Sequence, residues 1–426
     1  MIKPRQVLYD INHFGFFNYV ILSIFRNKKK YNKKFLQYHR LFQDKFYEIT
    51  GIENVLPLSR ARIGIYLYLK EIITSDKNEV LLSPFTIFDV VNMVICAGGK
   101  PIFIDINKKN DLNLNPINIE KNISDKTCCI LLTHYHLNNQ YIKDIKNICK
   151  NKNIKLLEDC AISLGSKVSS KHVGYFSDAS IYSFSIFKFI SVYQGGSLYI
   201  KDKKIRDLIY QKLNLYSTFK WTEMLVYVLK AVKFSLITNK YIFPIVFGII
   251  RFGYFRDIQV IRNAVKNDPR PFLRYDFPKN FYRKVNLFQL QEFTRQLSSL
   301  QKYQIIRKYN FLEYNKILGL YRNLSKNSCN SFLNYPIVFS SYYNKKLFLK
   351  YIMKRNFDIG EYYYRSCNKE NIFSAFKKTC PNSEHYSKCV VLLPTHKKIN
   401  KNYIIKLCKY IKDFINENPN CLTEIS

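Results

Sequence analysis

The chain is short of acidic residues, of glycine and proline, and of cysteines at the spacing that binds zinc. Its 426 residues include 31 Asp and Glu against 68 Lys and Arg, for a formal net charge of +37, and only 13 Gly and 13 Pro. The absence of a CxxC pair and of a Walker-type phosphate loop argues against zinc modules and P-loop nucleotide hydrolases. The 11 cysteines form no regular framework, so we expect mostly free thiols in a reducing compartment.

The shortage of acidic residues leaves a surface that should attract anions, and two origins for it stay open. Lys, Asn, Ile, Tyr and Phe are all abundant, which is typical of a protein from an AT-rich genome. An anionic substrate or membrane is the other explanation. Because the basic residues do not form an RNA-binding signature with interleaved aromatics, we expect no nucleic-acid partner.

The apolar stretches of the chain are interrupted by charge. Residues 14–25 read FGFFNYVILSIF and run into RNKKKYNKK with no small-residue cleavage site, so a secretory signal is not indicated. We expect a helix that either packs on the main body or lies on a membrane surface. Within 224–255 the longest uncharged run is Tyr241–Ile250, far below the roughly 20 residues that span a bilayer. Amphipathic helices there would cap the core, form a dimer contact or lie in a membrane interface.

The pattern along the chain predicts four segments: an N-terminal extension (1–50), a large domain (51–204), an apolar helical insertion (205–280), and a linking helix with a small α+β domain (281–426). Strands are expected at 79–82, 101–105, 128–134, 154–160, 179–185 and 196–200. Helices are expected at 62–73, 86–97 and 141–152. This alternation predicts an α/β domain with a mainly parallel sheet covered on both faces.

Polar side chains stand where the predicted strands end, which is where ligands bind in such sheets. Asp159 ends one strand, Ser183 ends the next, and Lys188 follows in a turn before Gly195-Gly196. An amine, a carboxylate and a hydroxyl are the groups that hold pyridoxal 5'-phosphate (PLP) by its aldehyde, ring nitrogen and phosphate. The alternative is that Lys188 is an ordinary surface lysine in a lysine-rich chain.

Several ordered motifs resemble those of the DegT/DnrJ/EryC1/StrS sugar aminotransferases, which share the type I aminotransferase fold. They are SPFTIFDVVNMVICAGGKPIFIDI, IKLLEDCA, SFSIFKFISVYQGG and VVLLPTHKKINKNYIIKLCKYI. The resemblance implies that Lys188 binds the PLP aldehyde and shuttles a proton, that Asp159 pairs with the pyridinium nitrogen, and that Ser183 binds the phosphate. The other implied positions are Ala61 and Arg62 at the phosphate, Ile87 beside the ring, and His134 and Arg283 at the substrate.

The resemblance further implies an aminotransferase that acts on a nucleotide-linked keto sugar for surface polysaccharide or glycan synthesis. It implies glutamate as amino donor, a homodimer with shared active sites, and a cytoplasmic location. No metal is expected. Three departures from the family pattern favour an alternative, a degenerate member that docks on a membrane as a partner in glycan assembly. Ile87 replaces an aromatic residue, Ile162 replaces Gln or His, and Phe281 stands where an Asn is usual.

Overall fold

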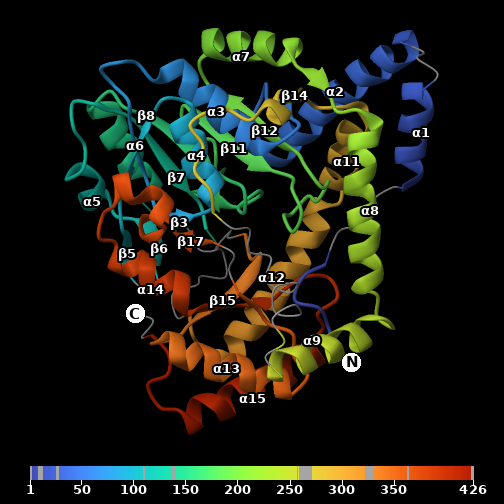
Figure 1. Cartoon of the computed structure of the whole chain (residues 1–426), viewed down its shortest axis with the longest axis vertical. Helices are drawn as coiled ribbons and strands as arrows, with labels where there is room; N and C mark the ends of the chain where they lie inside the picture. The colour runs from blue at the N-terminus through green and yellow to red at the C-terminus, as the bar shows by residue number, and fades with distance from the viewer. Residues whose placement is uncertain are drawn as a thin grey trace.

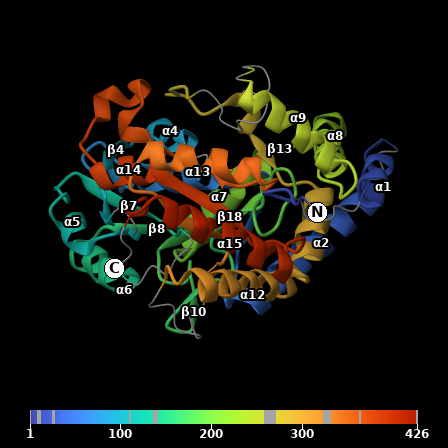
Figure 2. The same cartoon turned by 90° about the horizontal axis from the view of Figure 1, so that it is seen from below.

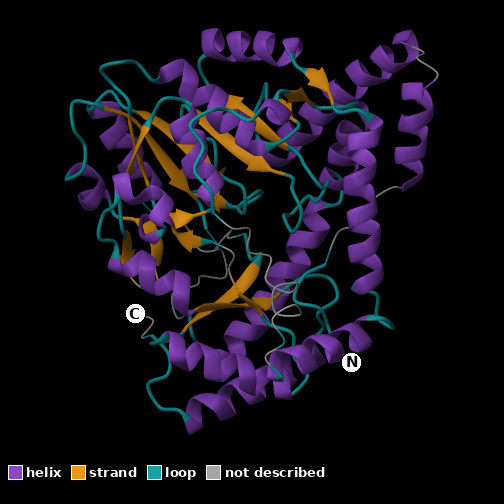
Figure 3. Cartoon of the chain, viewed as in Figure 1, coloured by secondary structure: helices purple, strands orange, loops and turns teal. Residues whose placement is uncertain are grey.

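The computed structural model describes residues 2–7, 13–24, 28–108, 111–135, 141–256, 258, 271–321, 331–361 and 364–423, and in them a seven-stranded sheet organises the large domain (Figures 1 and 3). Its strands, in spatial order, are β1 (Leu56–Leu58), β12 (Gly196–Ile200), β11 (Ala179–Ser183), β8 (Lys155–Asp159), β7 (Thr127–Thr133), β2 (Glu79–Leu82) and β4 (Lys100–Phe103). From β11 to β4 neighbouring strands are parallel, whereas β12 is antiparallel to both β11 and β1.

Helices cover both faces of this sheet, since its central strands are buried on both sides: all of β7 is buried, and so are the last four residues of β8. One apolar cluster joins the sheet to α3 (Ala61–Ile72) and α4 (Phe88–Cys96). A second joins the opposite face to α5 (Pro116–Glu120) and α6 (Ile142–Asn151). The Asn115 side chain caps α5 as its position before Pro116 suggests. The predicted α/β fold with a mainly parallel sheet is confirmed.

A smaller α+β unit follows in the chain (Figure 1). Its antiparallel sheet has the order β15 (Asn334–Val338), β18 (Val390–Pro394), β16 (Gly360–Glu361). The helices of this part of the chain are α12 (Leu300–Leu318), α13 (Tyr342–Lys354), α14 (Pro381–Cys389) and α15 (Lys401–Glu417). Short ladders in the described residues pair β3 (Phe85–Thr86) with β17 (Arg365–Ser366), β5 (Ile106–Lys108) with β6 (Asp111–Leu114), β9 (Lys167–Val168) with β10 (Lys171–His172), and β13 (Ser217–Thr218) with β14 (Arg283–Lys284).

The linking helix expected after about residue 281 is divided into two helices. α11 (Leu287–Leu297) ends at Ser298, and α12 begins after Ser299. The Ser298 hydroxyl donates to the Thr294 carbonyl at 3.2 Å. Adjacent serines offer the backbone alternative hydrogen bonds and so favour a break between two helices.

Four further helices lie along one side of the molecule (Figures 1 and 2): α1 (His13–Ile24), α2 (Lys28–Thr50), α8 (Trp221–Ile237) and α9 (Phe243–Phe255). α7 (Lys203–Leu215) comes before α8 in the chain and contacts β12, close to the edge of the sheet. Phe16 and Tyr19 bury the inner face of α1 against Phe288 of α11, in one cluster with Met224 of α8. The expected packing of 14–25 on the main body therefore holds for this inner face. Among the described helices, none is long and apolar enough to cross a bilayer.

Candidate functional site

The carboxyl ends of three neighbouring parallel strands carry the predicted polar side chains. His134 follows β7, Asp159 ends β8, and Ser183 ends β11. Asp159 pairs in register with Thr133 on one side and Ile181 on the other. The His134 backbone N–H also donates to the Asp159 carbonyl at 3.0 Å. The sheet therefore brings His134, Asp159 and Ser183 together at one edge.

Lys188 shares the buried space of Asp159. Each residue exposes only 6% of its surface. Burial raises the pKa of the Asp159 carboxyl, and three groups oppose that rise: the Ala161 N–H, which donates to Oδ1 at 3.0 Å, the Lys188 ammonium and His134. The Lys188 Nζ lies 5.9 Å from the centre of the Tyr364 ring. An amine and a carboxylate thus lie within electrostatic reach in a medium of low polarity, where charge interactions are strong.

The turn that carries Lys188 is held in an unusual conformation. Phe187, the residue before it, has a φ of +66°, which is uncommon for a bulky side chain. The Phe187 ring packs edge-on against Phe234 of α8, with ring centres 5.0 Å apart. The side chain of Gln296 on α11 accepts from the Ser191 N–H at 2.9 Å and donates to its carbonyl at 3.2 Å. Contacts from two helices therefore fix this turn, as is typical of functional sites.

Beside these residues, the start of α3 approaches the sheet closely. Ser183 pairs with Gly196 in the β11–β12 ladder. A Cβ on Gly196 would lie 2.7–2.8 Å from backbone atoms of Ala61, so only glycine permits this approach. The first amides of a helix have no intrahelical acceptor and favour anions. The Ser183 hydroxyl and the first turn of α3 therefore form an arrangement suited to a phosphate.

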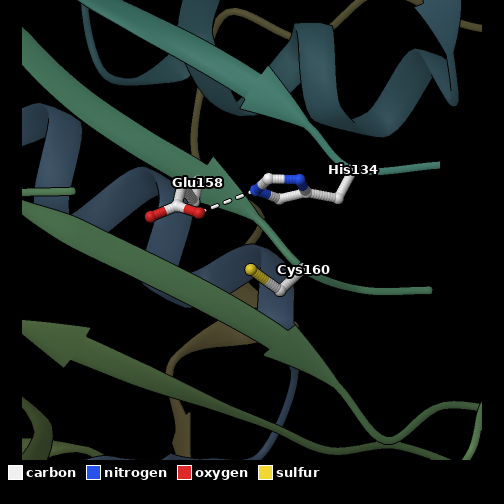
Figure 4. A group of neighbouring side chains, drawn as sticks. All are labelled: His134, Glu158 and Cys160. Atoms are coloured by element: carbon white, nitrogen blue, oxygen red, sulfur yellow. Dashed lines mark hydrogen bonds and ion pairs between the residues drawn. The ribbon is translucent and has the colours of Figure 1, made fainter. Parts of the chain in front are cut away.

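His134 is oriented by a carboxylate that sequence reasoning gave no role. Its Nε2 lies 2.7 Å from Oε2 of Glu158 (Figure 4). The same Oε2 accepts the Gly174 N–H at 2.7 Å, and Oε1 accepts the Phe176 N–H at 3.1 Å. Because an ionised Glu158 only accepts, Nε2 carries the proton and donates. The buried Nδ1 has no hydrogen-bonding partner among the described residues. His134 therefore has one nitrogen left for a ligand.

His134, Glu158 and Cys160 offer ligand atoms that all lie within 4.8 Å of one another, which is close enough for a metal ion (Figure 4). The carboxylate already accepts three hydrogen bonds, which satisfy its buried charge. Burial and the neighbouring acids raise the pKa of Cys160 well above its usual value, so this sulfur is a thiol and a poor metal ligand. The geometry favours a hydrogen-bonded cluster.

The other predicted positions have different surroundings. The guanidinium of Arg62 pairs with Asp89. At the start of α3, only the backbone of Arg62, and not its side chain, is therefore available to the predicted phosphate site. Ile87 caps α4 and is half-buried between two apolar clusters. Arg283 lies in the β13–β14 ladder, where its guanidinium contacts Glu223 at 3.0 Å and the Ser217 hydroxyl at 2.8 Å.

Two tyrosines near the strand ends were missed by sequence reasoning. Tyr364 faces the Lys188 amine, and the charge of Asp159 adds to the burial that raises the pKa of Tyr135. The two rings are 6.4 Å apart and both pack against Phe85. Tyr135 follows a strand end in the sequence, which was a usable signal, whereas Tyr364 comes from the distant β16–β17 region and carried none.

A cavity of about 430 Å³ lies between α1, α2 and α11. Its lining includes Tyr19, Lys34, Glu292 and Arg295, and none of the predicted site residues. The cavity is therefore separate from the strand-end site.

Comparison with known proteins agrees with the motifs. Residues 28–225 match the model of the DegT/DnrJ/EryC1/StrS aminotransferase family. This matched segment makes up a little less than half of the chain. The predicted resemblance is thereby confirmed, and the family is one of PLP-dependent aminotransferases.

Curated relatives match over part of their length. GDP-perosamine synthase of Escherichia coli O157:H7 is 30% identical over 170 residues, which are 40% of this chain and 46% of that protein. A UDP-4-amino-4,6-dideoxy-N-acetyl-beta-L-altrosamine transaminase of Helicobacter pylori is 28% identical over 170 residues, 39% of this chain and 44% of that one. The matched region thus spans less than half the length of each of these relatives.

Solved structures extend the likeness to the whole fold. The aminotransferase PseC of Helicobacter pylori has a TM-score of 0.71 at 17% identity, covering 98% of this chain and 100% of that one. An aminotransferase from Psychrobacter cryohalolentis has a TM-score of 0.72 at 13% identity, covering 97% and 99%. The DegT-type fold therefore includes the C-terminal part, which the family model does not reach.

Proposed function

We propose that this chain is a PLP-dependent aminotransferase that converts a nucleotide-linked keto sugar to an amino sugar. The observation that carries the proposal is the buried Lys188 amine within electrostatic reach of the buried Asp159 carboxylate, at the carboxyl ends of the strands. The motifs shared with the family support it, as do relatives named as transaminases of GDP- and UDP-linked sugars.

The residues present fit the cofactor. When bound, PLP supplies an aldehyde that exchanges amino groups and a ring that accepts electrons. Asp159 would face the ring nitrogen, whose positive charge would offset the burial that now raises the pKa of this carboxyl. The open Nδ1 of His134 would accept a hydrogen bond from cofactor or substrate. The backbone amides of Ala61 and Arg62, with the Ser183 hydroxyl, would hold the phosphate where Gly196 lets α3 approach.

Lys188 would bind the cofactor by its Nζ and, once released, move a proton between the carbon atoms that exchange the amino group. Its buried position suits this task, because a low-polarity site excludes water and strengthens the pull of Asp159. Ile87 would contact the ring as an apolar wall in place of a stacking aromatic.

The finer parts of the proposal concern substrate and assembly. The excess of basic residues suits a diphosphate-bearing sugar. Glutamate would be the amino donor, and the product would serve surface polysaccharide or another glycan. In a homodimer, Arg283 would leave its ion pair with Glu223 and bind the substrate in the site of the second copy. The proposed domain organisation is the one predicted from the sequence: an extension (1–50), a large domain (51–204), a helical insertion (205–280), and a linking helix with a small domain (281–426).

The proposal is tested by incubating the purified protein with PLP, removing free cofactor and recording the absorbance spectrum. We expect the visible band of lysine-bound PLP, its loss in Lys188→Ala, and its conversion by glutamate to the band of the aminated cofactor. Lys201→Ala, which removes an exposed lysine, is the matched control and should behave as wild type. A wild-type protein that retains no PLP would contradict the proposal and favour the degenerate, non-catalytic alternative.

A further inference from the structure

An apolar surface faces outward on α8 and α9. We define the outer face as Val226, Leu229, Leu236, Ile245, Ile249 and Phe252, each between 52% and 68% exposed. The spacing of three or four residues places the α9 members on one side of that helix, while Phe243 and Phe247 bury the opposite side. A surface helix normally turns polar residues outward, so these exposed apolar side chains indicate a site of interaction.

The same side of the molecule carries α1, which contacts α8 (Figures 1 and 2). Phe17, Ile21 and Ile24 of α1 are 51–62% exposed, at the same helical spacing. The basic run at 28–34 follows them directly in the chain. On this side of the molecule, α1 therefore adds a third helix with exposed apolar side chains, and positive charge follows it in the chain.

Charge around the outer face is almost all of one sign. Lys230 and Lys233 are exposed on α8, Lys240 lies in the turn to α9, and Arg256 follows α9. Between 221 and 256 the sequence contains a single acid, Glu223, and this residue is engaged by Arg283 at 3.0 Å. Exposed apolar side chains beside unopposed lysines match the polarity of an anionic membrane interface.

We infer that α8 and α9 dock this protein on an anionic lipid surface, with the outer face in the boundary between headgroups and acyl chains. Lys230, Lys233 and Lys240 would contact the headgroups. No described helix is able to cross the bilayer, so the contact is a peripheral one. The inference goes beyond the proposed activity and does not rest on it.

A second copy of the chain is the competing occupant, and charge disfavours it. A twofold contact through the outer face would place the lysines of one copy beside those of the other. Like charges brought together in an interface weaken association. An anionic membrane removes this repulsion, whereas a neutral membrane would offer only the apolar part of the attraction.

Vesicle flotation of the full-length protein tests the inference. Vesicles of phosphatidylcholine alone are compared with vesicles of phosphatidylcholine and phosphatidylglycerol in equal parts. We expect wild type to float with the anionic vesicles and to remain behind with the neutral ones. The double variants Ile245→Ser/Ile249→Ser and Lys230→Glu/Lys233→Glu should each lower the bound fraction about tenfold or more.

Matched controls are available on other elements. Ile305 of α12 and Ile405 of α15 are 69% and 48% exposed, and Lys406 and Lys409 are exposed on α15. The double variants Ile305→Ser/Ile405→Ser and Lys406→Glu/Lys409→Glu therefore make the same chemical changes elsewhere. Both should float as wild type, and all variants should retain the wild-type melting temperature. The inference is overturned if wild type does not float. It is equally overturned if the outer-face variants float like the controls, or if they only dissociate a dimer in sedimentation experiments.

Discussion

The strand-end site and the outer face of α8 and α9 depart from the ordinary distribution of polarity in opposite directions. At the strand ends, Lys188 and Asp159 are charged groups with 6% of their surface exposed. On α9, Ile245 and Ile249 are apolar groups with 68% and 56% exposed. Both departures cost free energy in the isolated chain, and each would be relieved by its proposed ligand: an aromatic cation with a phosphate at the strand ends, and a lipid surface at the outer face.

The two regions also differ in what supports them. The Lys188 turn is fixed by hydrogen bonds to Gln296 and by the sheet register, so its geometry is set before any ligand binds. Lipid binding by the outer face would require only that α8 and α9 keep their apolar sides exposed. We therefore expect single substitutions to be severe in the first region, whereas the second responds in proportion to the area or charge removed.

The largest effect is expected from Lys188→Ala. Removing the amine removes both the covalent attachment of the cofactor and the proton carrier, so kcat/KM for amino transfer should fall by at least about 10⁴-fold. Single-turnover assays with the cofactor-loaded protein measure this. Flotation of the variant should equal that of wild type. A loss of both properties would mean that the two regions are not separable.

Asp159→Asn should strongly lower kcat/KM but raise the stability of the cofactor-free protein. Loss of the carboxylate should lower kcat/KM by about 10²–10³-fold, because the ring nitrogen would no longer be held protonated. A raised folded-state pKa means that the folded protein binds this proton more tightly, so stability is lost as pH rises above the usual Asp pKa of 3.8. At neutral pH, Asn should therefore stabilise the cofactor-free protein by about 1 kcal/mol in urea unfolding. A destabilised variant would contradict this assignment of the burial cost.

The sequence pointed to the polar residues at the strand ends but not to the tyrosines around them, for a physical reason. Asp159 and Ser183 end neighbouring parallel strands, and Lys188 follows in the turn after the second, so parallel register and a short turn bring the three together. Tyr364 reaches the same space through long-range packing, which no local pattern encodes. Likewise, the sequence marked 224–255 as apolar but left open which residues face outward, because that depends on which side packs on α1 and α11.

Two histidines outside both regions, the buried His396 and the half-buried His172, give a third prediction, which tests whether burial of a polar group by itself marks a site. Burial and the Arg307 charge lower the pKa of His396 to about 3, and its Nε2 lies 2.9 Å from the Pro4 carbonyl. Burial and Lys167 lower the pKa of His172 to about 4. A lowered pKa means that the unfolded chain binds protons more tightly, so stability is lost as pH falls below 6.5.

By pH 4 the buried His396 should have contributed a loss of about 3 kcal/mol, and the half-buried His172 a smaller loss. Urea unfolding measured across this window should show the loss, and His396→Gln should flatten the dependence. Kinetic constants of His396→Gln at pH 7 should remain those of wild type, which would separate a structural histidine from His134. A variant as steep as wild type would show that His396 is not buried in its neutral form.

The smallest effect is expected where the two regions meet. Phe234 of α8 packs on Phe187, and removing its ring loosens the support of a turn held at positive φ. Phe234→Ala should lower kcat/KM about three- to tenfold and leave flotation unchanged. Leu236→Ala, two residues along the same helix and 55% exposed, should do the reverse, weakening flotation without changing kcat/KM. Opposite effects from neighbouring positions would show that α8 supports the Lys188 turn with one side and binds lipid with the other. If both variants changed both properties, membrane contact and the active-site turn would be coupled through this helix, and α8 would have to be treated as part of the site.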